Sequence, residues 1–282
     1  MLHFFTKNAR LAVAFVCGIL VTISLYQIDT CDDSLIDWSK VSADSMTGRQ
    51  ITEYFKWTNP NQPCQTSRSF GGKYFFPLGF DGQKELCLDK QVAPVSERCI
   101  VYSFGINNEW SFDDAMEEYG CSVFAFDPSM GVVDHLRNKR TRFYNMGLAA
   151  EDVVRNNWKM RTLASVYKRL QLQHGDLIVD YLKIDIEGDE WKVIENIVAS
   201  KMLPKIRQMG VEIHMWPVNG TIDHYRNLVK IIQLLEANGM VRFSSAVNTA
   251  TYQYIDAFGF KDYNCYEIAW YNSYHYGSST NL

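Results

Sequence analysis

From Cys99 onward, short apolar stretches alternate with stretches whose apolar residues repeat every three or four positions. The apolar stretches predict strands at 100–104, 123–126, 142–145, 177–186, 211–214, 240–244 and 267–271. The stretches between them predict helices at 112–119, 130–138, 163–170, 191–198 and 222–235. Strands that alternate with helices in this way indicate a largely parallel sheet covered on both faces. We therefore predict one α/β domain over residues 99–272, built on a doubly wound sheet of about seven strands.

The chain before Cys99 lacks this alternation. Residues 29–63 are polar, with a helical pattern at 46–57, and predict a stem that ends in an entry helix. Residues 64–98 are rich in glycine and aromatic side chains, which is typical of a small cap of short hairpins packed on a main domain. Residues 273–282 are expected to form a short tail.

An uncharged apolar run covers residues 11–28 and follows two basic residues. Its length, about 18 residues, is just enough to span a bilayer, and the positive charge in front of it predicts a cytoplasmic tail at 1–10. We expect a single-pass signal-anchor of type II. A cleaved signal peptide is the alternative, because Thr22 and Ser24 have the spacing of a cleavage site. Either segment places the rest of the chain in the secretory pathway, in the Golgi or endoplasmic reticulum lumen or outside the cell.

Cysteine content and charge fit that location. One of the seven cysteines lies in the apolar run, and the other six allow up to three disulfides. We favour a Cys87–Cys99 pair across a short loop, and leave Cys121 open between a disulfide and a buried thiol. Asn219 begins an N-glycosylation sequon. A net charge of −4 without a basic stripe argues against a nucleic-acid partner.

The candidate chemistry centres on residues 181–191, where an apolar strand runs into several acidic residues. Ligands of open α/β sheets bind at the carboxyl ends of strands. Asp185, still on the strand, is the favoured catalytic residue and Glu187 the second candidate, because either carboxylate could accept a proton from a substrate. Asp189 and Glu190 are expected to stabilise the start of the next helix.

Two earlier strand ends suggest a nucleoside site. Gly105 follows the first strand, and Asp127 ends the second strand 22 residues later. A glycine that allows close backbone approach, followed about 20 residues on by an acid that binds ribose hydroxyls, is typical of nucleotide-binding α/β folds. The single glycine is less than a dinucleotide motif, so a smaller adenosyl ligand is favoured.

A divalent metal is a further candidate ligand. Glu212 and His214 lie two positions apart at a strand end and so share one face of the strand. Together with Asp185 and Glu187 they could form an oxygen-rich metal site. The alternative for His214 is a hydrogen-bonded histidine of the core.

Three segments, 101–106, 126–128 and 182–188 (Leu-Lys-Ile-Asp-Ile-Glu-Gly), resemble the FkbM-type methyltransferase family, in particular the animal group of methyltransferase-like protein 24. The resemblance covers residues 64–272. It implies a class I methyltransferase-like, Rossmann-like fold with S-adenosyl-L-methionine as cofactor. The residues that would bind this cofactor are, by position, Ser103, Phe104, Gly105, Ile106, Asp127, Gly147, Leu148 and Asp185.

We therefore expect an S-adenosylmethionine-dependent methyltransferase of the secretory pathway that methylates an oxygen of a glycan or small-molecule acceptor. Two alternatives stay open. A Golgi-type metal-dependent glycosyltransferase is also a type II protein, and its acidic metal-binding pair could be imitated by Asp185 and Glu187. A catalytically inactive secreted binding domain would keep the same fold.

Overall fold

The computed structural model of the protein describes residues 11–16, 19–24, 36–62, 64–76 and 79–276. The chain divides into two units, residues 1–36 and 37–282. In the first unit, strands β1 (Leu11–Val16) and β2 (Ile19–Ser24) pair in antiparallel fashion. None of the helices in the described ranges is both long and apolar enough to cross a membrane. The expected anchor or signal peptide at 11–28 lies partly outside these ranges and stays a prediction.

The second unit is built on a sheet of eight strands. From one edge to the other they are β16 (Met240–Val247), β19 (Cys265–Asn272), β15 (Ile206–His214), β14 (Val179–Ile184), β7 (Ile100–Phe104), β8 (Ser122–Phe126), β10 (Thr141–Tyr144) and β9 (His135–Leu136). The five strands from β15 to β10 are parallel, whereas β19 and β9 each run antiparallel to their neighbours. This topology confirms the predicted α/β fold class of the methyltransferase-like, doubly wound type.

The strand order reverses at β7. The chain proceeds from β7 to β8 and β10 on one side, and β14 and β15 are added on the other side. Such a reversal is the switch point at which open α/β sheets bind their ligands, outside the carboxyl ends of the strands. The fold therefore directs attention to the ends of β7, β8 and β14.

One predicted helix is wrong. Residues 130–138 contain the end of a 3₁₀ turn, Pro128–Met130, followed by the short edge strand β9. Gly131 adopts a left-handed conformation (φ 65°), which ends the turn. Val133 and Leu136, whose spacing suggested a helix, are 77% and 58% exposed, so no core holds this stretch in a helical conformation.

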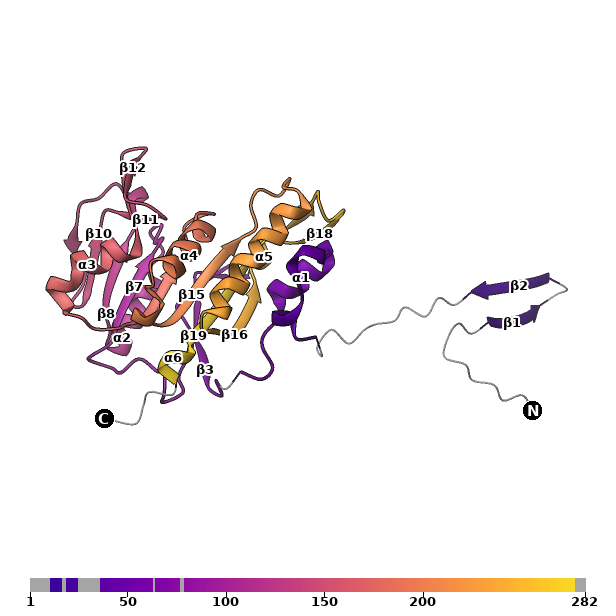
Figure 1. Ribbon diagram of the computed structural model, residues 1–282, viewed down its shortest axis with the longest axis horizontal. Coiled ribbons are helices and arrows are strands. Elements are labelled where there is room, and N and C mark those ends of the chain that lie inside the picture. The colour runs from indigo at the N-terminus through magenta and orange to yellow at the C-terminus, as the bar shows by residue number, and fades with distance from the viewer. Residues whose placement is uncertain (1–10, 17–18, 25–35, 63, 77–78, 277–282) are drawn as a thin grey trace. The chain divides into compact units, whose positions relative to one another are not determined.

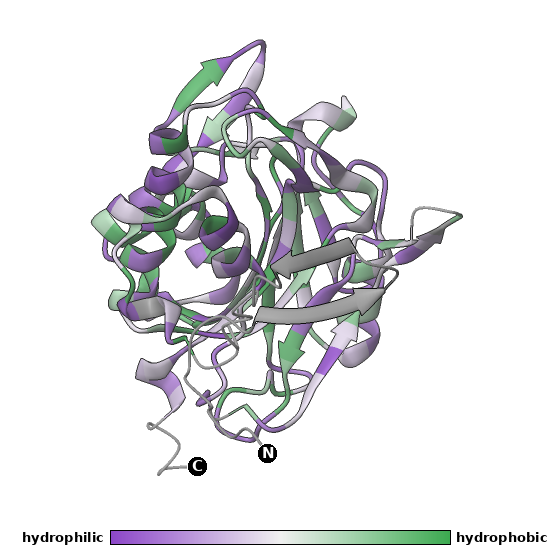
Figure 2. Cartoon of the chain, turned by 90° about the vertical axis from the view of Figure 1, so that its right-hand side faces the viewer, coloured by the Kyte–Doolittle hydropathy of each residue, from purple (hydrophilic) through white to green (hydrophobic). Residues whose placement is uncertain are grey.

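Helices cover both faces of the sheet (Figure 1). Three of them, α3 (Leu163–His174), α4 (Glu190–Ala199) and α5 (Ile222–Ala237), lie over one face, where Tyr102 of β7 contacts the ring of His174. On the opposite face α2 (Ser111–Tyr119) packs Phe112 against Val101 and Tyr181. Neighbouring residues of a strand point to opposite faces, so the fully buried β7 is apolar throughout except at Ser103. Figure 2 shows hydrophobic residues gathered in the central strands.

Local signals explain the helix ends. Helix α1 (Gly48–Lys56) lies within the predicted entry helix at 46–57. It begins at a capping box, in which the side chains of Thr47 and Gln50 each accept a hydrogen bond from the other residue's backbone N–H. Its Phe55 stacks on Tyr266 with ring centroids 5.5 Å apart, so this helix packs on the sheet domain. Helix α5 is capped by Thr221, the hydroxyl residue of the glycosylation sequon.

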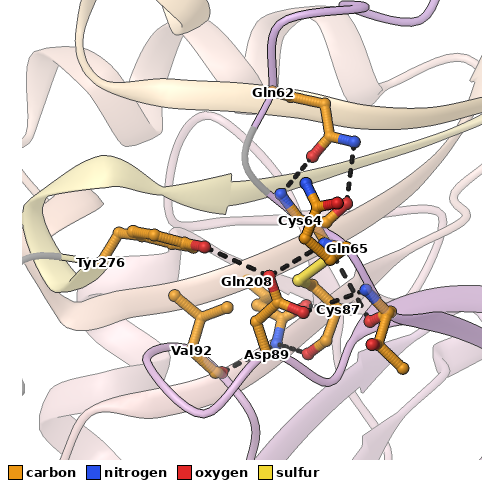
Figure 3. Close-up of a disulfide and its surroundings, with 9 residues drawn as sticks. Gln62, Cys64, Gln65, Cys87, Asp89, Val92, Gln208 and Tyr276 are labelled. Carbon is orange, nitrogen blue, oxygen red and sulfur yellow. Dashed lines mark hydrogen bonds between the residues drawn. A yellow bond between two sulfur atoms is a disulfide. The ribbon is translucent and has the colours of Figure 1, made fainter.

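The segment upstream of β7 forms two hairpins. Strand β3 (Ser67–Phe70) pairs with β6 (Lys84–Cys87), and β4 (Lys73–Phe75) pairs with β5 (Gly79–Asp81). A disulfide joins Cys64 to Cys87 beside them (Figure 3). The buried Gln208 of β15 accepts a hydrogen bond from the Cys87 N–H (2.8 Å) and donates to the carbonyls of Cys87 (2.9 Å) and Val92 (2.8 Å). These bonds fix the hairpins to the main sheet.

The favoured Cys87–Cys99 disulfide is wrong, because each of these cysteines has another partner. Cys99 bonds Cys121, which resolves the open question for Cys121, and links the start of β7 to the turn before β8. Cys265 is a buried free thiol. Cys31, the remaining candidate, lies outside the described residues.

Two small sheets were not predicted. One consists of β11 (Gly147–Leu148), β13 (Trp158–Arg161) and β12 (Val153–Arg155), and the other of β17 (Tyr252–Ile255) and β18 (Phe260–Tyr263). The first of these sheets contributes residues to the cavity described next, and the turn before β17 contributes Ala250 and Thr251.

Candidate functional site

A cavity of about 590 Å³ lies at the switch point of the sheet. This volume falls in the range of small-molecule sites, which is about 300–1,000 Å³. Every predicted site residue except Ser103 lines it: Phe104, Gly105, Ile106, Asp127, Gly147, Leu148, Asp185, Glu187, Glu212 and His214. Ser103 is fully buried on the face of β7 that packs against α2, where its hydroxyl lies beside the carboxyl of Asp113.

Gly105 allows three strand ends to meet. Its φ is +80°, and a Cβ atom at this position would lie 1.6 Å from the carbonyl oxygen of Asp185. Its own N–H donates to the carbonyl of Phe126 at 3.0 Å. Only glycine fits this close approach, and Gly105 also lines the cavity.

Asp127 shapes the loop that follows Gly105. One carboxylate oxygen accepts hydrogen bonds from the N–H groups of Ile106 (2.9 Å) and Asn107 (2.8 Å). The other accepts from the N–H (2.7 Å) and the hydroxyl (2.6 Å) of Ser129. Asn107 has a φ of 44°, a left-handed conformation that asparagine tolerates better than most residues. The side chain predicted to bind ribose thus holds the cavity wall in shape.

Two buried lysines surround Asp185. The Lys183 ammonium group donates to the Gly105 carbonyl at 2.5 Å and lies 3.7 Å from the Asp185 carboxylate. Lys84 lies 4.0 Å from the same carboxylate and donates to Glu267 at 2.6 Å. Burial acts to raise the pKa of Asp185, but the two ammonium groups outweigh it and hold that pKa below its ordinary value. Asp185 is therefore an ionised carboxylate.

The loop after β14 is organised by Glu190. This fully buried carboxylate accepts hydrogen bonds from the N–H groups of Ile186 and Gly188, both at 2.9 Å. Glu187, between them, has a φ of 59° and an exposed side chain. Partial burial, with Asp185 and Glu190 nearby, raises the pKa of Glu187. Glu190 therefore folds the loop before α4, and Asp189 makes an ion pair with Arg155.

His214 lies at the end of β15 and is 4% exposed. Its Nδ1 is 3.1 Å from the Glu190 carboxylate, and its Nε2 is 3.7 Å from that of Glu187. Burial acts to lower the pKa of His214, but contacts with Cys265 and Glu190 outweigh it and raise the pKa above its ordinary value. Nδ1 of His214 is thus fixed by Glu190, whereas Nε2 is directed to the cavity.

The four predicted metal ligands do not form one set. Asp185, Glu187 and His214 have ligand atoms within 4.8 Å of one another, but Glu212 belongs to other groups. Glu212 accepts a hydrogen bond from Asn248 at 2.9 Å. Burial, with Glu267 and Asp185 nearby, raises the pKa of Glu212 to about 8. Since two lysines already balance Asp185, this arrangement does not fit an oxygen-rich divalent cation.

Several lining residues were not predicted. Lys183 had a visible signal, because it is a lysine within the apolar strand 179–184. Trp158 and Met160 come from β13, and Asn248 from the loop before β17; nothing in their sequence surroundings marks them. Lys84 follows the Asp81-Gly82 turn, but its burial is visible only in the fold.

A largely parallel sheet, in which β19 and β9 run antiparallel to their neighbours, and a small-molecule cavity at its switch point are typical of the class I methyltransferase-like group of α/β domains. The family model described as "Methyltransferase domain" matches residues 37–261. The chain belongs to this methyltransferase-domain family, which confirms the methyltransferase resemblance of its motifs.

The curated relatives agree with this assignment. The chain is 27% identical over 191 residues to the probable methyltransferase-like protein 24 of Homo sapiens, covering 63% of this chain and 51% of that protein. It is 26% identical over 208 residues to the same protein of Rattus norvegicus, covering 67% and 55%. The chain therefore spans about half the length of these relatives. A solved structure of the Methanococcus jannaschii fibrillarin pre-rRNA processing protein aligns at a TM-score of 0.35 and 8% identity, over 76% of this chain and 86% of that chain.

Membership of this family implies S-adenosylmethionine as cofactor, and the cavity suits it. The cofactor carries positive charge on its sulfonium and ammonium groups. The cavity is lined by seven acidic side chains and by three basic ones, Arg155, Lys183 and His214. Leu148, Met160 and Trp158 add an apolar wall that suits a nucleobase.

Proposed function

We propose that the chain is an S-adenosylmethionine-dependent methyltransferase that acts on an oxygen of a glycan or small molecule in the secretory pathway. The observation that carries this proposal is the acidic cavity at the switch point, where Gly105 lies against Asp185. A cationic nucleoside matches both its position in the fold and its charge.

Cofactor binding is assigned to the loop after β7 and to the small sheet that contains β11. The backbone of 104–106 is proposed to hold the amino-acid end, and Asp127 the ribose. Gly147 and Leu148, beside Met160 and Trp158, would hold the adenine. When bound, the cofactor supplies an electrophilic methyl group, and the protein contributes positioning, which can supply several kcal/mol of the barrier.

The two acidic residues after β14 are given different roles. Asp185 is held ionised by Lys183 and Lys84, so it is a weak base, and we assign to it the stabilisation of positive charge in the cavity. Glu187 has a raised pKa and an exposed carboxylate beside the cavity. A base is more effective when its pKa is closer to the working pH, so we assign proton removal from the acceptor hydroxyl to Glu187.

The cellular location is supported by the covalent chemistry. The two disulfides, Cys64–Cys87 and Cys99–Cys121, favour an oxidising compartment. Together with the apolar segment at 11–28, they support a luminal domain on a type II anchor, with secretion after cleavage as the alternative.

Calorimetry with the full chain tests the proposal. We expect S-adenosylhomocysteine to bind and UDP-sugars with Mn²⁺ not to bind. Glu187→Gln should keep this binding but lose methyl transfer to glycan acceptors. Binding of a UDP-sugar alone would replace the proposal with a glycosyltransferase, and binding of neither ligand would favour an inactive domain.

A further inference from the structure

Three side chains of different chemistry meet at one wall of the cavity. Glu212 and His214 share a face of β15, and Cys265 of β19 is the direct register partner of His214. Their ligand atoms all lie within 4.8 Å of one another. All three residues are buried, at 6%, 4% and 3% exposure, and all three line the cavity.

A second, independent feature concerns the orientation of His214. Glu190 is fully buried, is fixed by two backbone N–H groups, and places its carboxylate 3.1 Å from Nδ1 of the imidazole. Metal-binding histidines almost always have such a carboxylate or carbonyl partner on the nitrogen that does not bind the metal, because it fixes the ring and its tautomer. Nε2 of His214, which lies 3.7 Å from the exposed Glu187 carboxylate, is the ring nitrogen that remains for a metal.

The third feature is the thiol. Among the cysteines of the described residues, Cys265 is the one outside a disulfide, although two disulfides form elsewhere in the same domain. A thiol, an imidazole and a carboxylate are the ligand types that zinc takes, whereas magnesium and calcium take oxygen ligands.

We infer that Glu212, His214 and Cys265 form a zinc site in the wall of the cavity, with Glu190 as the residue that positions His214. Tetrahedral zinc has ligands at about 2.0–2.3 Å and therefore about 3.3–3.8 Å from one another, so these ligand atoms need to close up by about 1.5 Å at most. Three protein ligands leave one position for a fourth ligand, which is the arrangement of open zinc sites. The site differs from the oxygen-rich set because Cys265 replaces Asp185 and Glu187, and it does not depend on the proposed methyl transfer.

Metal analysis of the full chain tests the inference. After exposure to Zn²⁺ and dialysis, the wild-type chain should retain about one zinc per chain by mass spectrometry. Cys265→Ser and His214→Gln should each lose it, while Glu109→Gln, at an acidic lining residue that belongs to none of the ligand groups, should retain it. Glu190→Gln should weaken zinc binding by about 10- to 100-fold, as expected for a positioning residue.

Cobalt substitution of the wild-type chain tests the same site without a variant. Bound Co²⁺ should show a sulfur-to-cobalt charge-transfer band and the visible absorption of a tetrahedral ion. Absence of this band, retention of zinc by Cys265→Ser, or Mg²⁺ binding in place of zinc would each overturn the inference. Circular dichroism and thermal unfolding report whether each variant is folded.

Discussion

The carbonyl oxygen of Asp185 occupies the space next to Gly105, 1.6 Å from the point at which a Cβ atom would be placed. This contact joins the ends of β7 and β14 at the switch point of the sheet. The loop that we propose to hold the cofactor and the proposed catalytic strand end therefore share one fixed position, and a change at either residue affects both.

Gly105→Ala should destabilise the domain by about 3 kcal/mol or more, because overpacking against backbone adds to a strained φ. Gly131→Ala is the matched control, since Gly131 is in the left-handed helical region with a φ of +65° and has no neighbour within 4 Å of the added Cβ. The control should lose only about 1 kcal/mol. Urea unfolding measures both, and equal losses would contradict the contact with Asp185.

Asp127→Asn should lower the free energy of unfolding by about 2–3 kcal/mol, because an amide cannot accept the four hydrogen bonds that the carboxylate accepts. Ser129→Ala removes one of these donors and should cost about 1 kcal/mol. Asp127→Asn should also weaken S-adenosylhomocysteine binding in calorimetry below the unfolding temperature. Unchanged affinity in that variant would refute the ribose assignment.

Lys84→Met should destabilise the domain by about 3 kcal/mol, because it leaves the buried Glu267 without its cation. Adding Glu267→Gln should recover at least half of this loss, since the uncompensated charge is then removed. Chemical denaturation of the single and double variants measures the recovery. Additive losses would show that the two side chains are not coupled.

Asp113 should make stability depend on pH. Burial raises its pKa from 3.8 to about 6, against the opposing effects of Lys183 and Ser103. The folded state therefore binds more protons between these values, and the contribution of Asp113 to stability is lost as pH rises through about 6. Relative to wild type, Asp113→Asn should gain up to roughly 3 kcal/mol between pH 4 and pH 7. Asp114→Asn, at an exposed neighbour, should show no such gain.

The main strands could be predicted because burial on both faces makes them apolar, as in 100–104 and 123–126. The small sheets could not, because their strands are short and partly exposed: Trp158 is 41% exposed and Tyr252 is 56% exposed. Apolar and polar residues do not alternate clearly along these strands, so the sequence does not distinguish them from turns.

The residues of the candidate site also divide into those that could be predicted from the sequence and those that could not. Asp127 and Asp185 could be predicted because an acid at the end of an apolar strand is visible locally. The pairing of Lys84 with Glu267, 183 residues apart, depends on how the cap hairpin packs on β19 and β15. The same reason explains the wrong cysteine pair: Cys87 and Cys99 are close in the chain, but Cys87 ends β6 whereas Cys99 directly precedes β7.

Strand β19 is the last of the main sheet to be made, yet it lies between β15 and β16 and not at an edge. During synthesis, β15 and β16 must wait for residues 265–272 before the sheet can close. Cys265, the final contributor to the cavity, arrives in the same step. A chain that ends before residue 265 therefore lacks this part of the pocket wall, and ligand binding can serve as a readout that the sheet has closed.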